Sequence, residues 1–405
     1  MAGSHVVFAL QETRRYKIVS IDNFHNSYPK AFKRLEEVAR SALPADASET
    51  EKESTVIDAY RCDLTNPADV RAVFEKYGKG GIWGVVHIAV RFSRSVFAEE
   101  KTHVEAHRPG AKQAYKAVGE STEIPLTYYH NNVSATIYLL QIMSEFDCTR
   151  FVYSSSATVY GTPPEVPIPE TTRLQADSPY GQSKIMSESV IRDLMQGVCS
   201  FFVASRPLCE LGTAEPMRWR AISLRYFNPA GAHPSGLIGE DPRGRPGNLL
   251  PLLAHMAVGR VKESTLQVFG DDYPTPCVFH FLRPPPLFLP LRLLNLKLTP
   301  CFRLLHSDGT CVRDYLHVLD LAAGHLLALD ALAPGSTVFD NCPSPARFKV
   351  YNLGRGQGFS VLQILEAMRA ATGFDYRYNI IGRRCVAFMV VVLTRLAADD
   401  SYQAR

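Results

Sequence analysis

Two residues in the middle of the chain have the types and spacing needed to remove a proton from an alcohol. Tyr180 and Lys184 open an expected helix and are four residues apart, so their side chains lie on one face. A neighbouring ammonium favours phenolate over phenol, so we expect it to lower the pKa of the tyrosine from its usual value of about 10. A phenol of this kind is a general base for a sugar or alcohol hydroxyl.

Ser156 ends an expected apolar strand upstream of this helix, and its hydroxyl can hydrogen-bond and orient the same alcohol. Removing a proton from a carbinol oxidises it only if something accepts a hydride, which protein side chains cannot do. A nicotinamide cofactor is therefore implied. The Tyr-x-x-x-Lys pair alone is weak evidence, because an exposed helix start beside a core tyrosine gives the same pattern. Its combination with the serine run is much stronger.

The composition argues against several classes of protein. The 405 residues, 46% of them apolar, suffice for one large or two ordinary domains. The formal net charge of +4 is small and spread along the chain, which predicts no nucleic-acid or membrane partner. The nine cysteines occur singly, without metal-ligand spacing, which predicts reduced thiols in a cytoplasmic protein and no metal site. No signal peptide is recognised, and no apolar stretch reaches the ~20 residues that span a bilayer.

Apolar strands alternate with helices through the first half of the chain. Strands are expected at residues 17–22, 55–61, 84–89, 150–156 and 221–227, and helices at residues 28–43, 67–77, 125–146 and 180–196. This alternation predicts an α/β fold, a Rossmann-type doubly wound parallel sheet. Ligands bind beyond the carboxyl ends of the strands in such sheets. That edge is where we expect Asp22, Asp63, Ala89, Ser156 and Asn228.

Asp22 ends its strand in the position of an acid that binds the adenosine ribose hydroxyls. Such an acid favours NAD over NADP, because it would repel a 2′-phosphate; an ordinary helix cap is the alternative. From residue 228 onward the sequence becomes richer in loops and arginines. We therefore predict a cofactor domain at residues 1–227, a smaller C-terminal α/β substrate domain at 228–384, and a divergent tail at 385–405.

Four segments do not fit this pattern. They are residues 91–114, 198–213, 277–307 and 385–405, which lack a clear period. Structureless segments of such length are uncommon in compact domains.

The remaining sequence resembles the UDP-glucose 4-epimerase family of the extended short-chain dehydrogenase/reductase superfamily. The motifs that carry the resemblance are IDNFHNS at 21–27, KAVGES at 116–121, YYHNNVSAT at 128–136, SSSATVYG at 154–161, SPYGQSK at 178–184, LRYFNPAGAH at 224–233, DGTCVRDYLHVLDLA at 308–322 and YNLGRGQGFSVLQ at 351–363. Together they are far more specific than superfamily membership requires.

The resemblance implies an NAD-dependent isomerase, usually dimeric, that interconverts UDP-galactose and UDP-glucose in galactose metabolism. It implies that Tyr180 is the base, that Lys184 binds the nicotinamide ribose and tunes the tyrosine, and that Ser156 holds the sugar hydroxyl. The implied NAD-binding positions also include Gly3, Asp22, Asn23, Asp63, Leu64, Ala89, Lys116, Asn131 and Phe227. Those implied for the UDP-sugar, besides Ser156, are Asn228, Asn248, Arg313 and Arg384.

The chain also departs from the family pattern. The family opens with a strand and a glycine-rich turn whose backbone N–H groups bind the pyrophosphate. Here only Gly3, near the start, matches the end of that motif. Our hypothesis is that the four unusual segments are translated introns or misassigned ends of a gene model, which sequencing of the transcript would test. Without the first strand and its turn, we expect weaker folding and weaker NAD binding.

Two other interpretations remain open at this stage. A related nucleotide-sugar dehydratase or decarboxylase shares the scaffold, but a dehydratase needs an acid pair near the tyrosine, and Ala157 and Thr158 offer none. A catalytically defective nucleotide-sugar-binding protein fits the lost glycines but not the retained Ser156, Tyr180 and Lys184. NAD bound to the purified protein would favour an enzyme.

Overall fold

A computed structural model gives the fold of the protein. It describes residues 1–88, 118–204, 219–242, 246–262, 265–273, 308–340 and 347–382, with the backbone alone at 118–120 and 197–204. The unusual segments at 91–114, 277–307 and 385–405 lie outside the described residues, as does 205–213. Three predicted site residues lie outside them too: Ala89, Lys116 and Arg384.

The centre of the molecule is a parallel sheet of four strands, in the order β3-β4-β5-β9. The strands are β3 (Val85–His87), β4 (Arg150–Ser156), β5 (Arg220–Tyr226) and β9 (Phe348–Leu353). Parallel strands require helical crossovers, which the alternation of apolar strands and helices predicted. The α/β doubly wound class is thus confirmed. The last strand, β9, comes from the second half of the chain.

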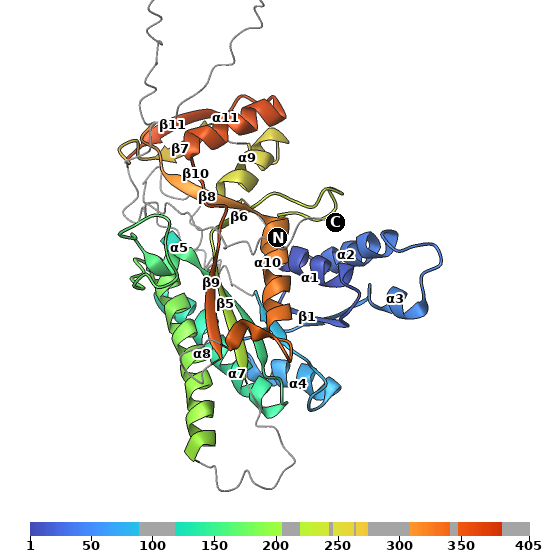
Figure 1. Cartoon of the computed structure of the whole chain (residues 1–405). Coiled ribbons are helices and arrows are strands. Elements are labelled where there is room, and N and C mark those ends of the chain that lie inside the picture. The colour runs from blue at the N-terminus through green and yellow to red at the C-terminus, as the bar shows by residue number, and fades with distance from the viewer. Residues whose placement is uncertain are drawn as a thin grey trace, which may run out of the picture.

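Helices cover both faces of this sheet (Figure 1). Phe151 and Tyr153 of β4 pack in a cluster with residues of α7 (Ala135–Glu145) and α8 (Pro179–Ala204). Val152, between them, packs with residues of α10 (Val318–Ala331) on the opposite face. Successive side chains of a strand alternate between faces, so a strand with helices on both sides is apolar throughout.

A second, two-stranded parallel sheet holds β1 (Ile18–Asp22) and β2 (Ile57–Arg61). Among the described residues, β1 pairs only with β2, and β3 pairs only with β4. Residues of both β1 and β3 line one large cavity. The sheet that the sequence predicted as continuous is therefore divided between β1 and β3, where we expected a family strand to be lacking.

The first residues form a helix, α1 (Ala2–Glu12), that the sequence analysis did not predict. His5 and Phe8 are buried on one of its sides. The helix packs against α10 and α2 (Lys30–Ser41) (Figure 1). Just beyond its end, Arg15 Nη2 donates to Asp330 Oδ1 at 2.8 Å, which ties the start of the chain to α10. Burial of an apolar side stabilises such a helix despite its modest amphipathicity.

The C-terminal elements build a smaller unit above the sheet (Figure 1). β8 (Val312–His317) lies between β6 (Asn228–Ala230) and β10 (Gly358–Ser360), and β11 (Arg377–Ile381) pairs with β7 (Thr265–Phe269). A separate core, which includes Leu253, Leu365 and Tyr376, joins α9 (Leu249–Ala257) and α11 (Val361–Thr372). The remaining elements are α3 (Glu49–Glu53), α4 (Pro67–Tyr77), α5 (Val118–Glu123), α6 (Pro125–Tyr129), η1 (His130–Ser134), η2 (Ala157–Tyr160) and η4 (Thr337–Phe339).

Candidate active site

Tyr180 and Lys184 lie in the first two turns of α8, where local contacts fix the start of the helix. Ser178 Oγ caps the first turn by accepting a hydrogen bond from Gly181 N at 3.1 Å. A Cβ at Gly181 would lie 2.8 Å from Thr158 O, so only glycine allows α8 to approach the end of β4 this closely. The start of the helix is thus held against the strand that carries the serines.

Lys184 is almost completely buried, and its Nζ lies 6.0 Å from the centroid of the Tyr180 ring. Its Nζ donates a hydrogen bond to Ser154 O at 2.7 Å and lies 4.7 Å from the centroid of the Tyr153 ring. Burial lowers the pKa of Lys184 to about 7, while Glu188, one turn further along α8, raises it. The lysine is thus anchored to β4, and its charge is sensitive to its surroundings.

The pKa of Tyr180 is raised, which corrects the expectation that Lys184 would lower it. Burial has the largest effect, because it disfavours the phenolate, and Tyr226 adds to it. A hydrogen bond with Ser156 acts in the opposite direction. Lys184 is not among the groups that lower the pKa of Tyr180, and burial also lowers the pKa of Lys184 itself.

Ser156 ends β4 and begins the short helix η2. Its Oγ accepts hydrogen bonds from Thr158 N at 3.3 Å and from Thr158 Oγ1 at 3.0 Å. Ser156, Thr158 and Tyr180 line the same cavity. Two hydroxyl groups and a phenol therefore converge at the carboxyl end of β4, where a substrate hydroxyl can be held and deprotonated.

This cavity has a volume of about 1770 Å³ and brings most of the predicted site residues together. Lys184 is not among its lining residues, since it lies behind Tyr180. The predicted residues that line it are Gly3, Asp22, Asn23, Asp63, Leu64, Asn131, Ser156, Tyr180, Phe227, Asn228, Asn248 and Arg313. A volume of this size exceeds the ~300–1,000 Å³ of ordinary small-molecule sites.

Asp22 lies at the carboxyl end of β1, as predicted. Its Oδ1 accepts hydrogen bonds from Phe24 N at 2.6 Å and Ser27 Oγ at 2.8 Å, which shape the following loop. Both bonds use one oxygen, so the other keeps its capacity to accept from a ribose hydroxyl. Asn23 Nδ2 donates to Asp63 Oδ2 at 3.1 Å and joins this loop to the end of β2.

The predicted substrate residues lie on the opposite side, where the C-terminal unit meets the sheet. Asn228 Nδ2 donates to Asp314 O at 3.0 Å, and Arg313 Nη1 donates to Val312 O at 2.9 Å. Asn248 precedes α9 as its N-cap residue and makes no side-chain capping bond. These contacts hold Asn228 and Arg313 at the cavity wall.

Three further residues of this region were missed by the sequence analysis. Thr158 and Tyr226 line the cavity together with Ser156 and Tyr180, and both belong to motifs quoted above. His87, at the end of β3, is 5% exposed, and neither of its ring nitrogens has a partner among the described residues. Its only sequence signal was a polar residue within an apolar strand.

The expected continuous helix at residues 125–146 is divided. A π-helical turn, η1, separates α6 from α7 and carries Asn131 into the cavity wall. Asn132 Nδ2 donates to Ser183 Oγ at 2.8 Å, and Asn132 O accepts from Ser187 Oγ at 3.3 Å. Such π turns often occur at functional sites because they re-aim side chains. Here the turn is fixed to the face of α8 beside Lys184.

The residues present fit an NAD molecule. Asp22 keeps a carboxylate oxygen that can accept from a ribose hydroxyl, and Tyr180 lines the same cavity with a phenol that can exchange a proton. The first turn of α1 also lines the cavity, with Ala2, Gly3 and Ser4, and a Cβ at Gly3 would meet nothing within 4 Å. Free N–H groups in a first helical turn can bind a phosphate. No group of three or more metal-binding side chains occurs among the described residues.

Comparison with known proteins places the chain in a family. Residues 95–354 match the NAD dependent epimerase/dehydratase family. The chain belongs to this family. A UDP-glucose 4-epimerase of Bacillus subtilis is 37% identical over 382 residues, which cover 94% of this chain and 82% of that protein. The corresponding protein of Drosophila melanogaster is 35% identical over 389 residues, with the same two coverages.

A solved structure of an epimerase of this family supports the architecture. The UDP-glucose 4-epimerase of Bifidobacterium longum, in complex with NAD+ and UDP, aligns with a TM-score of 0.67 and 33% sequence identity. The alignment covers 98% of this chain and 88% of that one. The described helices include none that is long and apolar enough to cross a membrane.

Proposed function

We propose that this chain is an NAD-dependent UDP-glucose 4-epimerase that interconverts UDP-galactose and UDP-glucose through a 4-keto sugar. The observation that carries the proposal is that Ser156 and Tyr180 line one wall of a cavity of about 1770 Å³, with Lys184 buried close to Tyr180 and bound to Ser154 O. The NAD dependent epimerase/dehydratase family and the named relatives support the same reaction.

The side chains have separable tasks in this reaction. Tyr180 removes the proton from the sugar O4 and later returns it, while Ser156 hydrogen-bonds that oxygen and orients it. Lys184, anchored on Ser154 O, fixes the Tyr180 side of α8 and supplies positive charge beneath it. When bound, NAD would supply the acceptor for the C4 hydride, which no side chain can provide.

Both ligands are assigned to particular walls. Asp22, Asn23 and Asp63 at the ends of β1 and β2 hold the adenosine end of NAD, with Leu64, Asn131 and Phe227 along its length. Asn228, Asn248 and Arg313 hold the UDP portion, and the predicted Arg384 adds to them from outside the described residues. A cation with a planar fork suits a diphosphate.

The organisation of the protein follows from these assignments. The NAD site belongs to the predicted domain at residues 1–227 and the UDP-sugar site to that at 228–384. A homodimer and a cytoplasmic location complete the proposal. Support for the cytoplasmic location comes from Cys62 and Cys148, which are buried thiols that form no disulfide with another described residue.

The test is turnover of UDP-galactose by the purified full chain, with UDP-glucose measured by a coupled assay and bound NAD measured by absorbance after denaturation. We expect NAD to copurify and UDP-glucose to form. NAD without turnover of UDP-galactose, but with loss of water from another nucleotide sugar, would indicate a dehydratase instead. Absence of both NAD and turnover would contradict the enzyme and leave a nucleotide-sugar-binding protein.

A further inference from the structure

Beyond Tyr180 and Lys184, α8 carries a buried carboxylate on the same helical face. Glu188 lies four residues beyond Lys184, on the same helical face, and is fully buried. Its carboxylate forms a bidentate ion pair with Arg225 of β5: Nε donates to Oε1 at 3.0 Å and Nη2 donates to Oε2 at 2.6 Å. Ser223 Oγ also donates to Oε1, at 2.9 Å.

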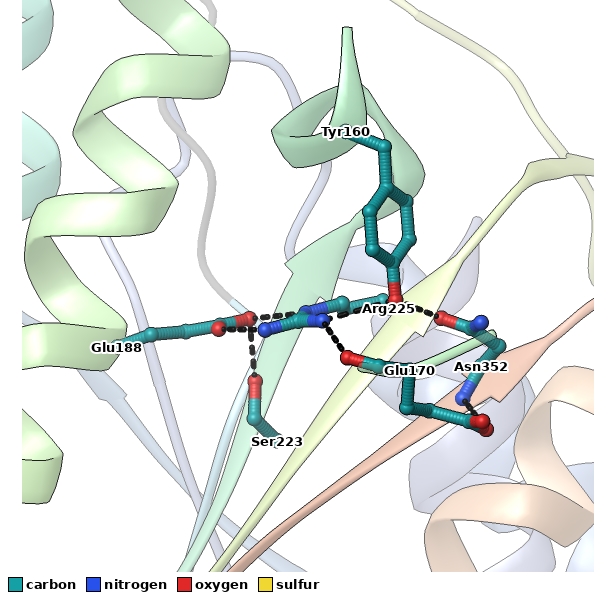
Figure 2. Close-up of polar contacts among 6 residues, drawn as sticks. All are labelled: Tyr160, Glu170, Glu188, Ser223, Arg225 and Asn352. Carbon is teal, nitrogen blue, oxygen red and sulfur yellow. Dashed lines mark hydrogen bonds and ion pairs between the residues drawn. The ribbon is translucent and has the colours of Figure 1, made fainter. Parts of the chain in front are cut away.

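Arg225 links this ion pair to Tyr160 on the short helix η2 (Figure 2). Its Nη1 donates to Tyr160 OH at 2.8 Å and to Glu170 O at 3.2 Å. Tyr160 ends η2, the short helix that begins at Ser156. The guanidinium therefore connects the helix of Tyr180 and Lys184 to the turn that carries the serine.

A second set of contacts fixes the outer end of the network (Figure 2). Tyr160 OH donates to Asn352 Oδ1 at 2.7 Å. Asn352, on β9, donates through Nδ2 to Ile168 O at 2.9 Å and through its backbone N to Glu170 Oε1 at 3.0 Å. The network spans α8, β5, η2, the following loop and β9, and none of its six side chains in Figure 2 lines the cavity.

A buried ion pair is weak evidence for stability, because desolvation offsets the attraction between its charges. Its placement suggests a different role. We propose that Glu188 and Arg225 are a positioning pair for the active site: they hold α8 and η2 in register, and Glu188 sustains the positive charge of Lys184. This inference rests on the proposed function for its catalytic consequence, although its electrostatic part does not.

The charge of Lys184 depends on groups from every element around it. Burial lowers its pKa and Glu188 raises it. The titratable and charged groups in this surrounding are Tyr180 and Glu188 on α8, His87 on β3, Tyr153 on β4, and Tyr226 and Arg225 on β5. Among these, Glu188 is the anion that raises the pKa of Lys184.

The experiment measures the pKa of Lys184 by NMR of the full chain labelled with ¹³Cε-lysine, and Lys184→Met identifies the resonance. Glu188→Gln should lower this pKa by about one pH unit, as expected for loss of a neighbouring opposite charge. The double variant Glu188→Gln/Arg225→Met should give a smaller decrease, because the arginine cation is removed as well. Asp193→Asn, which removes an exposed carboxylate from the same helix, should change nothing.

Catalysis gives the second measurement. In the double variant, kcat for UDP-galactose should fall at least tenfold, while KM should stay within about threefold of that of the unchanged chain. The alkaline limb of the pH profile of kcat should shift together with the pKa of Lys184. An unchanged pKa and kcat in the folded double variant would overturn the proposal. A double variant that does not fold would also contradict it, since it would show that the pair holds the fold. If the unchanged chain does not convert UDP-galactose, the proposed function fails, while the Lys184 titration still decides this inference.

Discussion

The ammonium nitrogen of Lys184 lies 6.0 Å from the centroid of the Tyr180 ring, and both groups are on the same side of α8. The lysine does not donate to the phenol but to Ser154 O on β4. Because burial raises the pKa of Tyr180, the phenol is held in its protonated form at neutral pH.

Tyr180→Phe should reduce kcat for UDP-galactose by about 10²–10⁴-fold, the usual contribution of a general acid–base group. The ring and its contact with Tyr128 remain, so the melting temperature should change little. Steady-state kinetics and a thermal melt test both points, and Tyr138→Phe on α7 is the matched control. Retention of more than a tenth of the activity would assign the proton transfer to another group.

His87→Phe should make the protein less sensitive to acid. Burial lowers the pKa of His87 to about 3, and the charge of Lys184 contributes. Between pH 6.5 and 3 the unfolded chain therefore binds a proton that the folded chain does not. Because of that proton, the free energy of unfolding decreases by about 1.4 kcal/mol for each unit by which the pH is lowered. Above pH 6.5 the group is neutral in both states, so this contribution disappears.

Urea unfolding from pH 7 to pH 4 measures this effect. The His87→Phe variant should lose less stability over that range than the unchanged chain, while buried His325 contributes equally to both. Phenylalanine fits beside Phe151 and Tyr153, whose rings already contact His87. His130→Phe, at an exposed position, is the control. Parallel curves for His87→Phe and the unchanged chain would rule out a neutral buried imidazole.

Asp22→Asn should relax the preference for NAD over NADP. The amide oxygen can still accept from Phe24 N and Ser27 Oγ, so the loop after β1 is kept, but the charge that repels a 2′-phosphate is removed. We expect NAD affinity to fall about tenfold and NADP affinity to rise, as measured by calorimetry, with a tenfold change corresponding to about 1.4 kcal/mol. Asp69→Asn, on the exposed side of α4, is the control. An unchanged ratio of the two affinities would remove Asp22 from the ribose site.

Local patterns predicted the main strands well, because an apolar run bounded by polar residues has few alternatives. The strand at 150–156 and the helix at 67–77 agree with the structure residue for residue. The helix at 2–12 was missed, since packing against α10 rather than its own pattern stabilises it. The π turn within 125–146 leaves almost no trace in a helical period.

The sequence predicted which residues form the site, but it did not predict their pKa values. The motifs placed Ser156, Tyr180 and Asp22 at strand or helix ends, and the structure brings them to one cavity. The predicted direction of the pKa shift of Tyr180 was wrong. The spacing of four residues between Tyr180 and Lys184 does not indicate how deeply the two side chains are buried. The network of Arg225 was not foreseen either, since it joins elements up to 192 residues apart in sequence.

Arg313→Leu should raise KM for UDP-galactose with little effect on kcat. Arg313 lies at the cavity wall beside Asn228, and β8 pairs with β10 through its backbone, so the strand keeps its place when the side chain changes. An interaction made equally with substrate and transition state changes KM alone. We expect KM to increase about 10–100-fold, as loss of one charge-assisted contact of about 1.5–3 kcal/mol implies.

Arg313→Lys tests the geometry of that contact. Lysine keeps the charge but lacks the planar fork that binds a diphosphate in bidentate fashion. The KM of Arg313→Lys should therefore lie between that of the unchanged chain and that of Arg313→Leu. Inhibition by UDP, compared among the three proteins, separates the nucleotide from the sugar. If Arg313 contacts the diphosphate, the inhibition constant for UDP rises in step with KM. A constant that stays fixed while KM rises would place Arg313 at the sugar instead.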